Sequence, residues 1–259
     1  MPALEPHTIR QMSTSPAGAD GRVLIVNADD FGFSPAVNAG VIKAHEHGIV
    51  TSASLMVRWP AAEIAASYCR EHPRLGLGLH LDFSEWVWRD GEWACVYQVV
   101  ATDDPEAVGQ EARRQLEEFR RLAGADPTHI DSHQHLHIKV EPPVAAAITE
   151  LADELGVPLR HRTAGIRYEG ALYAQTEKGE HVAGAGGVEQ LLEVISALQP
   201  GVTELACHPG EGDEIDSVYG VERQAELAVL CDRRVREAIA RSGIRLCSFA
   251  DLTRPSVSS

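Results

Sequence analysis

The sequence has few cysteines, and their spacing fits neither a disulfide framework nor a thiolate metal site. Its five cysteines are scattered over 259 residues, their number is odd, and no two form a Cys-x-x-Cys pair. Disulfide frameworks need paired cysteines, and thiolate zinc sites need closely spaced ones. We therefore exclude both kinds of site and expect the chain to work in a reducing compartment, most simply the cytoplasm.

The sequence also lacks a basic cluster, and negative charge is in large excess. Its 38 acidic and 23 basic residues give a formal net charge of −15 at pH 7. Such a chain repels the phosphates of nucleic acids and anionic lipid surfaces. We therefore expect no nucleic acid and no membrane as partner, and phosphate substrates are slightly disfavoured.

A long apolar run is missing from residues 1–20, which are rich in Pro, Ser, Thr and Ala. Signal peptides and membrane spans both need such a run. We expect residues 1–20 to be a disordered leader. The chain as a whole is 44% hydrophobic, which is enough for one sizeable core, so we expect residues 21–259 to form a single domain.

From Arg22 onward, short apolar runs rich in β-branched residues alternate with longer amphipathic stretches. This alternation is typical of βα units in an α/β fold with a mainly parallel sheet. The expected strands are the seven ranges 23–27, 50–57, 75–81, 129–131, 158–161, 203–207 and 244–248. The expected helices are 35–47, 61–70, 105–123, 143–155, 188–198 and 221–241. Two remaining segments, 82–104 and 162–187, are long enough to be active-site loops.

Polar side chains gather at the carboxyl ends of the expected strands. These residues are Asp29, Asp30, His80, Asp131, His133 and His208. The carboxyl ends of parallel strands meet at one edge of a barrel or sheet, so side chains distant in sequence converge there. Taken singly, an aspartate such as Asp30 is more often a helix cap, and for His80 a packed core histidine and a functional one are equal alternatives. Their joint placement favours a shared site.

The densest cluster is the segment 131–137, Asp-Ser-His-Gln-His-Leu-His, and its composition favours metal binding over packing. We predict one divalent ion held by Asp30, His80 and His133. Two imidazoles and one carboxylate suit zinc or a similar ion and leave positions open for water and substrate. The pattern leaves open which of His133, His135 and His137 bind, because an extended chain aligns all three and a helical turn aligns the first and last. The others would support the ligands or contact substrate, with plain surface histidines as the alternative.

Asp29 is the expected general base and His208 is the expected general acid. In extended backbone, Asp29 and its neighbour Asp30 point to different sides, so one carboxylate can bind a metal while the other acts as a base. His208 stands where a strand leads into a loop, and the pKa range of imidazole suits a general acid, with capping or packing as the alternative. Arg160 and His161 end the fifth expected strand, where they can contact substrate or organise the base.

Five short segments follow one another along nearly the whole chain: 27–32 (Asn-Ala-Asp-Asp-Phe-Gly), 48–52 (Gly-Ile-Val-Thr-Ser), 78–80 (Gly-Leu-His), 128–137 (Thr-His-Ile-Asp-Ser-His-Gln-His-Leu-His) and 207–209 (Cys-His-Pro). Together they resemble the YdjC-like carbohydrate deacetylases, which include chitooligosaccharide deacetylases and hopanoid-biosynthesis-associated deacetylases. The resemblance implies a distorted (β/α) barrel related to polysaccharide deacetylases, and a homodimer. It implies Asp30, His80 and His133 as metal ligands, Asp29 as base and His208 as acid. It also implies magnesium, whereas the ligand chemistry favours zinc or a similar ion.

The expected function is metal-dependent removal of the N-acetyl group from an amino sugar or oligosaccharide, with release of acetate. Trp86, Trp88 and Trp93 suit stacking on sugar faces, with packing or loop anchoring as equal alternatives. The nearest rival is a metal-dependent hydrolase of another amide, ester or phosphate. A glycosidase is weaker because it leaves the histidines without a purpose. A non-catalytic sugar-binding or metal-binding relative is disfavoured because Asp29 and His208 accompany the ligands.

Overall fold

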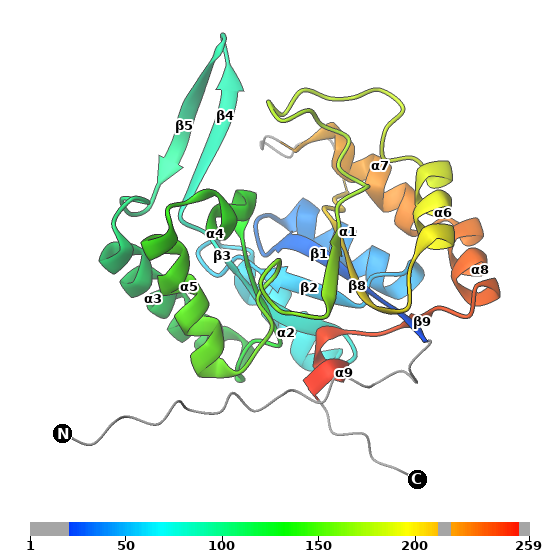
Figure 1. Ribbon diagram of the computed structural model, residues 1–259, viewed down its shortest axis with the longest axis horizontal. Helices are drawn as coiled ribbons and strands as arrows, with labels where there is room; N and C mark the ends of the chain where they lie inside the picture. Colours follow the sequence, from blue (N-terminus) through cyan, green and yellow to red (C-terminus); the bar gives the residue numbers. More distant parts are fainter. Residues whose placement is uncertain (1–20, 212–218, 254–259) are drawn as a thin grey trace.

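A parallel sheet forms the centre of the fold (Figure 1). The computed structural model describes residues 21–211 and 219–253, and within them the sheet has seven strands in the order β6-β3-β2-β1-β8-β7, with β9 paired to β1. Every one of these pairs is parallel. The strands are β1 (Arg22–Phe31), β2 (Ser52–Leu55), β3 (Gly76–Leu81), β6 (Ile130–Ser132), β7 (Ile166–Glu169), β8 (Gly201–Cys207) and β9 (Arg245–Leu246).

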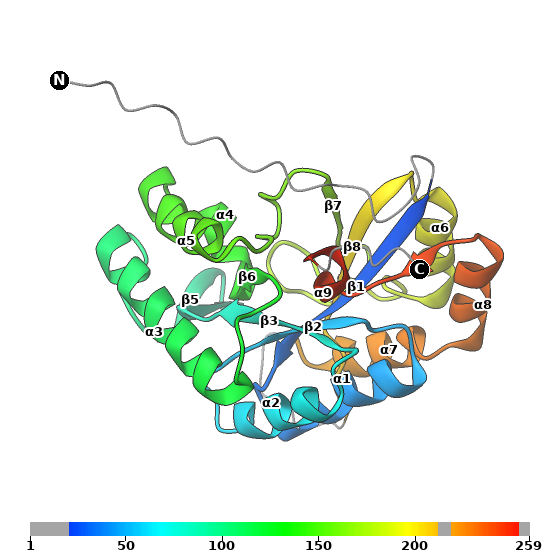
Figure 2. The same cartoon turned by 90° about the horizontal axis from the view of Figure 1, so that it is seen from below.

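The sheet is curled into a half-barrel with helices along its outer side (Figure 2). The helices are α1 (Pro35–His47), α2 (Ala62–Glu71), α3 (Pro105–Ala123), α4 (Leu136–Lys139), α5 (Pro142–Leu155), α6 (Val188–Ala197), α7 (Val221–Leu230), α8 (Arg233–Arg241) and α9 (Phe249–Thr253), with a 3-10 turn at His133–His135. A proline opens α1, α3 and α5, where its fixed φ suits the first turn. The expected distorted barrel of about seven mainly parallel strands is therefore confirmed.

The main hydrophobic core lies between the sheet and the outer helices. It is built from β-branched and aliphatic side chains of the central strands, such as Leu24, Val26 and Leu79, and from apolar faces of the helices. The short helix α9 packs on the other side of the sheet, against β3 and against Val23 and Ile25 of β1. There, Phe249 donates its backbone N–H to Ser52, and its ring stacks on buried His129 at a centroid distance of 3.9 Å. Strands that are covered on both faces have nearly continuous apolar sequences, and the central strands of this sheet do.

Two of the expected elements are wrong. The expected strand 158–161 is reduced to a single bridge between Leu159 and Ile130, because the backbone of His161 turns into the left-handed region with φ 62°. The expected helix 221–241 is two helices, α7 and α8. Asp232 separates them with extended backbone, and its carboxylate accepts from the N–H of Arg234 to cap α8.

The two expected loops contain strands. Segment 82–104 holds an antiparallel hairpin, β4 (Ser84–Arg89) and β5 (Glu92–Gln98), which projects beyond the body of the molecule in Figure 1. Segment 162–187 holds β7, which pairs with β8 at the edge of the sheet. Among the described residues, no helix combines the length and apolar character that crossing a membrane requires. The expected leader, residues 1–20, lies outside the described residues, and the single domain over 21–259 stays a prediction.

Candidate active site

A pocket of about 670 Å³ opens at the carboxyl ends of the strands. Six of the expected site residues line it: Asp29, Asp30, His80, His133, His135 and His208. Asp131, His137 and Arg160 are buried but do not line the pocket, and His161 is exposed and lies outside its lining. The convergence of strand ends therefore brings together residues from β1 and β3, from the position after β8 and from the turn after β6.

Asp30, His80 and His133 form a compact group that can hold a metal ion, and we call these three residues the metal-site group. Oδ1 of Asp30 lies 3.2 Å from Nε2 of His80 and 3.2 Å from Nδ1 of His133. Two ligands held at about 2.1 Å from one ion lie roughly 3.0 to 3.4 Å apart. Nε2 of His80 is buried and forms no hydrogen bond within the described chain. The spacing, the donor types and this unsatisfied nitrogen all fit one divalent ion.

Asp131 orients the His80 ring by binding Nδ1, the nitrogen that faces away from Asp30. Its carboxylate accepts from Nδ1–H of His80 at 2.7 Å and from the hydroxyl of Ser54 at 2.8 Å. Because a carboxylate only accepts, the proton sits on Nδ1 and Nε2 faces Asp30, as in many metal-binding histidines. Burial lowers the pKa of His80, but Asp131 raises it and the net pKa lies well above its usual value.

A backbone irregularity presents Asp30 to the two histidines. The pairing of β1 with β2 shifts register between Ala28 and Phe31, and Asp30 adopts a left-handed conformation with φ 63°. The turn is held by Asn38, whose Oδ1 accepts from the N–H of Gly32 at 2.7 Å. The expectation that Asp30 is in extended backbone is therefore wrong. The two neighbouring carboxylates take different partners because the chain turns at Asp30.

Asp29 is paired with the buried Arg160. The guanidinium donates two hydrogen bonds to the carboxylate, from Nη1 to Oδ2 at 2.5 Å and from Nη2 to Oδ1 at 2.7 Å. Arg160 also donates from Nε to Glu204 at 2.8 Å, and its Nη2 lies 2.9 Å from Asp131. Burial raises the pKa of Asp29, but Arg160 outweighs this and the net pKa lies below its usual value. Asp29 is thus an ionised carboxylate in a fixed orientation.

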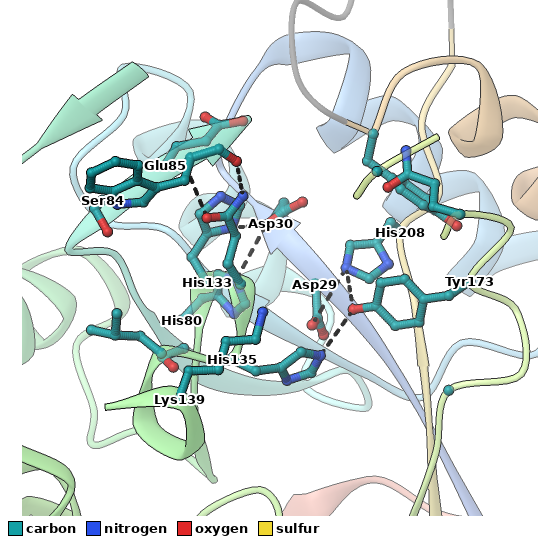
Figure 3. Close-up of a pocket in the computed structure, with 18 of the residues that line it drawn as sticks. Asp29, Asp30, His80, Ser84, Glu85, His133, His135, Lys139, Tyr173 and His208 are labelled. Carbon is teal, nitrogen blue, oxygen red and sulfur yellow. Dashed lines mark hydrogen bonds and ion pairs between the residues drawn. The ribbon is translucent and has the colours of Figure 1, made fainter. Parts of the chain in front are cut away.

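His208 faces Asp29 across the pocket, and Figure 3 shows Asp29 between the metal-site group and His208. Nε2 of His208 lies 3.7 Å from Oδ2 of Asp29 and 3.0 Å from the hydroxyl of Tyr173. That hydroxyl also lies 3.3 Å from Nε2 of His135. Burial lowers the pKa of His208 to about 4 although Asp29 opposes the shift. His208 is therefore neutral near pH 7 in the free protein.

The three histidines of segment 131–137 have three different surroundings. Gln134 and His135 both have positive φ, 51° and 55°, so the chain is neither extended nor regularly helical here. As a result, His133 joins the metal-site group and His135 lies beside Tyr173 in the pocket wall. Neither alignment considered from the sequence occurs, because two consecutive left-handed residues turn each side chain in a separate direction.

His137 and His161 lie outside the pocket. Both ring nitrogens of His137 are engaged, Nδ1 by the hydroxyl of Ser132 at 2.6 Å and Nε2 by the carbonyl of Arg160 at 3.0 Å. His137 therefore has no nitrogen left for a metal and instead holds the backbone of Arg160. The ring of His161 packs against Tyr168 at a centroid distance of 4.1 Å.

The hairpin β4–β5 supplies aromatic side chains to the rim of the pocket. Trp86 and Trp93 line the pocket and are 36% and 50% exposed. Trp88 is not among the lining residues, and Nζ of Lys178 lies 4.5 Å from its ring centroid. Gln134 fixes the hairpin, since its amide exchanges two hydrogen bonds with the backbone of Trp86 at 3.0 and 2.8 Å. Two tryptophans thus remain open to a ligand.

Several residues at the site were not predicted from the sequence, and three of them contact the expected site residues directly. Tyr173 bridges His208 and His135, Glu204 shares Arg160 with Asp29, and Arg223 donates from Nη2 to Oδ2 of Asp30 at 2.6 Å. Only Tyr173 has a sequence signal, because it lies in a tyrosine-containing segment that was expected to be an active-site loop. Glu204 and Arg223 lie within a strand and a helix and look like ordinary surface charges in sequence.

The chain shares its half-barrel fold with solved polysaccharide deacetylases. A peptidoglycan N-acetylglucosamine deacetylase has this fold, with a TM-score of 0.57 at 12% identity over 93% of this chain and 92% of its own. A proposed cellobiose-phosphate cleavage protein from Enterococcus faecalis V583 aligns with a TM-score of 0.70 at 25% identity, over 90% of this chain and 100% of its own.

The chain belongs to the YdjC-like family, whose model, described as YdjC-like protein, matches residues 23–241. A chitooligosaccharide deacetylase from Serratia marcescens is 34% identical over 261 residues, covering 89% of this chain and 99% of that protein. A carbohydrate deacetylase from Brevibacillus brevis is 33% identical over 248 residues, covering 88% of this chain and 99% of that protein. The family resemblance seen in the five motifs is therefore confirmed.

Proposed function

We propose that this protein is a metal-dependent carbohydrate deacetylase that hydrolyses the N-acetyl group of an acetylated amino sugar or oligosaccharide. The observation that carries the proposal is the placement of Asp29 and His208 beside the Asp30, His80 and His133 group in one pocket. The relatives named as chitooligosaccharide and carbohydrate deacetylases support the substrate class. The same pocket thus holds a group that can bind a metal ion, an ionised carboxylate and a neutral imidazole.

Asp30, His80 and His133 would hold one divalent ion, magnesium by family resemblance or zinc or a similar ion by ligand chemistry. Such an ion supplies Lewis acidity, which polarises an acetamide carbonyl and makes water more acidic. Asp131 keeps Nε2 of His80 turned toward Asp30. Because the group lies at the pocket wall, it can reach a substrate that enters from solvent.

Asp29 is the general base in this proposal. Arg160 keeps its carboxylate ionised and oriented, so Oδ2 can take a proton from the attacking water. His208 starts neutral because burial lowers its pKa to about 4. Its Nε2 lies 3.7 Å from Oδ2 of Asp29, so it can receive that proton and deliver it to the departing amine nitrogen. The products are acetate and a free amino sugar.

The rim of the pocket suits a sugar. The rings of Trp86 and Trp93 are partly exposed, and flat aromatic rings bind the apolar C–H faces of pyranoses. We also propose a reducing, cytoplasmic location, which is supported by five cysteines that are all free thiols. The homodimer that the family resemblance implies stays a prediction.

The test is acetate release from N-acetylglucosamine monosaccharides and oligosaccharides by purified protein, with added Zn²⁺ or Mg²⁺ and again after chelation. We expect acetate only with metal. The Asp30→Asn variant should lose bound metal and turnover together, whereas Asp29→Asn should keep the metal and lose roughly a hundredfold or more in rate. An Asp126→Asn variant, at an exposed position outside the pocket lining, serves as the matched control. Metal-independent turnover, or a normal rate in Asp29→Asn, contradicts the proposal.

A further inference from the structure

Arg223 on α7 is buried and charged, and its guanidinium contacts Asp30 of the metal-site group. Its side chain is 2% exposed, Nη2 donates to Oδ2 of Asp30 at 2.6 Å, and Nε donates to the carbonyl of Tyr219 at 2.6 Å. Nη1 forms no hydrogen bond within the described residues. Burying an arginine is unfavourable unless a charged partner compensates, so an apolar residue would serve better if packing were the only role.

The contact divides the two oxygens of Asp30 between different partners. Oδ1 faces Nε2 of His80 and Nδ1 of His133, whereas Oδ2 faces Arg223. A carboxylate with both oxygens free can rotate or bind an ion through both oxygens. With Oδ2 held by a guanidinium, only Oδ1 is presented to the space between the two histidines. The backbone of Asp30 is also in the left-handed region, which a non-glycine residue adopts only when its surroundings hold it there.

The neighbouring carboxylate has its own arginine. Arg160 pairs with Asp29 and Arg223 pairs with Asp30, and the two arginines come from segments 63 positions apart in the chain, by the difference of their numbers. Two adjacent carboxylates in one pocket would repel each other and compete for a single cation. Separate guanidiniums let each carboxylate keep its charge and its orientation.

We propose that Arg223 is a positioning residue that makes Asp30 a single-oxygen metal ligand. It holds Oδ2 of Asp30, so that Oδ1 alone would be available to an ion between the two histidines. This inference rests on the proposed metal site, and it concerns binding of the ion itself, without substrate. Positioning groups behind metal ligands typically change metal affinity by about 10- to 100-fold when removed.

The experiment compares the wild-type chain with Arg223→Met and Arg223→Lys in metal-free form, each titrated with Co²⁺ as the probe. We expect Arg223→Met to bind Co²⁺ about 10- to 100-fold more weakly. Its visible absorption bands should also weaken, because coordination by both oxygens raises the coordination number. Arg223→Lys should lie between the two, since one ammonium can reach Asp30 but cannot also hold the Tyr219 carbonyl. Arg234→Met, which removes an exposed arginine of α8, is the matched control and should match wild type.

Thermal melts of the metal-free proteins identify which variants are folded. Folded Arg223→Met with unchanged Co²⁺ affinity and an unchanged spectrum would overturn the inference. Failure of both substitutions to fold would also overturn it, because Arg223 would then act through stability alone. If wild-type protein binds no Co²⁺, the proposed metal site itself fails, and this outcome is distinct from the other two.

Discussion

Arg160 and Asp29 form a buried, two-pronged ion pair, with hydrogen bonds of 2.5 and 2.7 Å, although they are 131 positions apart in the chain. The same guanidinium contacts Glu204 and Asp131, so three buried carboxylates share one cation. Burial raises the pKa of Glu204 to about 7 even with Arg160 beside it. Arg160 therefore compensates buried negative charge in addition to orienting the proposed base.

Replacing Arg160 by methionine should lower the free energy of unfolding by about 3 to 5 kcal/mol, because buried carboxylates lose their partner. Urea denaturation at pH 7 measures this change. Arg113→Met is the control, because its ion pair with Glu154 is half exposed and should change stability by no more than about 1 kcal/mol. Equal effects of the two substitutions would show that Arg160 does not compensate the carboxylates.

Asp131→Asn should weaken metal binding by about 10- to 100-fold while the fold is kept. The amide is a poorer acceptor for Nδ1–H of His80, so the imidazole is less firmly held with Nε2 toward Asp30. Competition with a chromophoric chelator measures the affinity. Asp126→Asn, which removes an exposed carboxylate, should leave it unchanged. Wild-type affinity in Asp131→Asn would mean that His80 is oriented by other contacts.

Trp93→Ala should raise KM for N-acetylated oligosaccharides by roughly three- to tenfold with little change in kcat, because the substitution removes a ring from the rim and leaves the reacting groups in place. Steady-state acetate release against oligosaccharide concentration measures both constants. Val96→Ala provides a control on the same strand, since Val96 is exposed and does not line the pocket. A fall in kcat without a change in KM would contradict a binding role for Trp93.

His129 should make the protein less stable as the pH falls below 6.5. Burial lowers the pKa of His129 to about 4, with Asp131 opposing, whereas an unfolded chain has a histidine pKa near its ordinary value. Between these values the unfolded state binds the proton and the folded state does not. The stability contribution is therefore present above about pH 6.5 and is lost as the pH falls toward 4, by about 2 kcal/mol between pH 7 and pH 5.

Denaturation of wild type and His129→Gln at pH 7 and pH 5 tests this dependence. The variant cannot titrate at this position, so its stability should fall by about 2 kcal/mol less than that of wild type over the interval. His47→Gln, at an exposed position, is the control and should follow wild type. Parallel pH curves for His129→Gln and wild type would contradict the assignment.

Sequence periodicity predicted most of the fold because helices and parallel strands repeat at short range. The helices Pro35–His47 and Pro105–Ala123 have the expected bounds, since a proline in the first turn and a capping side chain mark their starts. The break at Asp232 and the hairpin β4–β5 were not predicted. A single capping aspartate inside an amphipathic run, or a two-stranded hairpin outside the core, leaves only a weak signal in hydrophobic pattern.

The sequence by itself determined at which edge of the sheet the pocket lies, because all parallel strands end at the same side of the sheet. That rule was enough to bring Asp29, Asp30, His80 and His208 together. The tertiary structure alone decided what each residue contacts. The left-handed backbone after β6 selected among the three histidines, and packing of distant elements delivered two arginines to two adjacent carboxylates. The direction of a side chain depends on the local backbone φ and on the neighbouring side chains that pack against it. The hydrophobic periodicity of the sequence encodes neither.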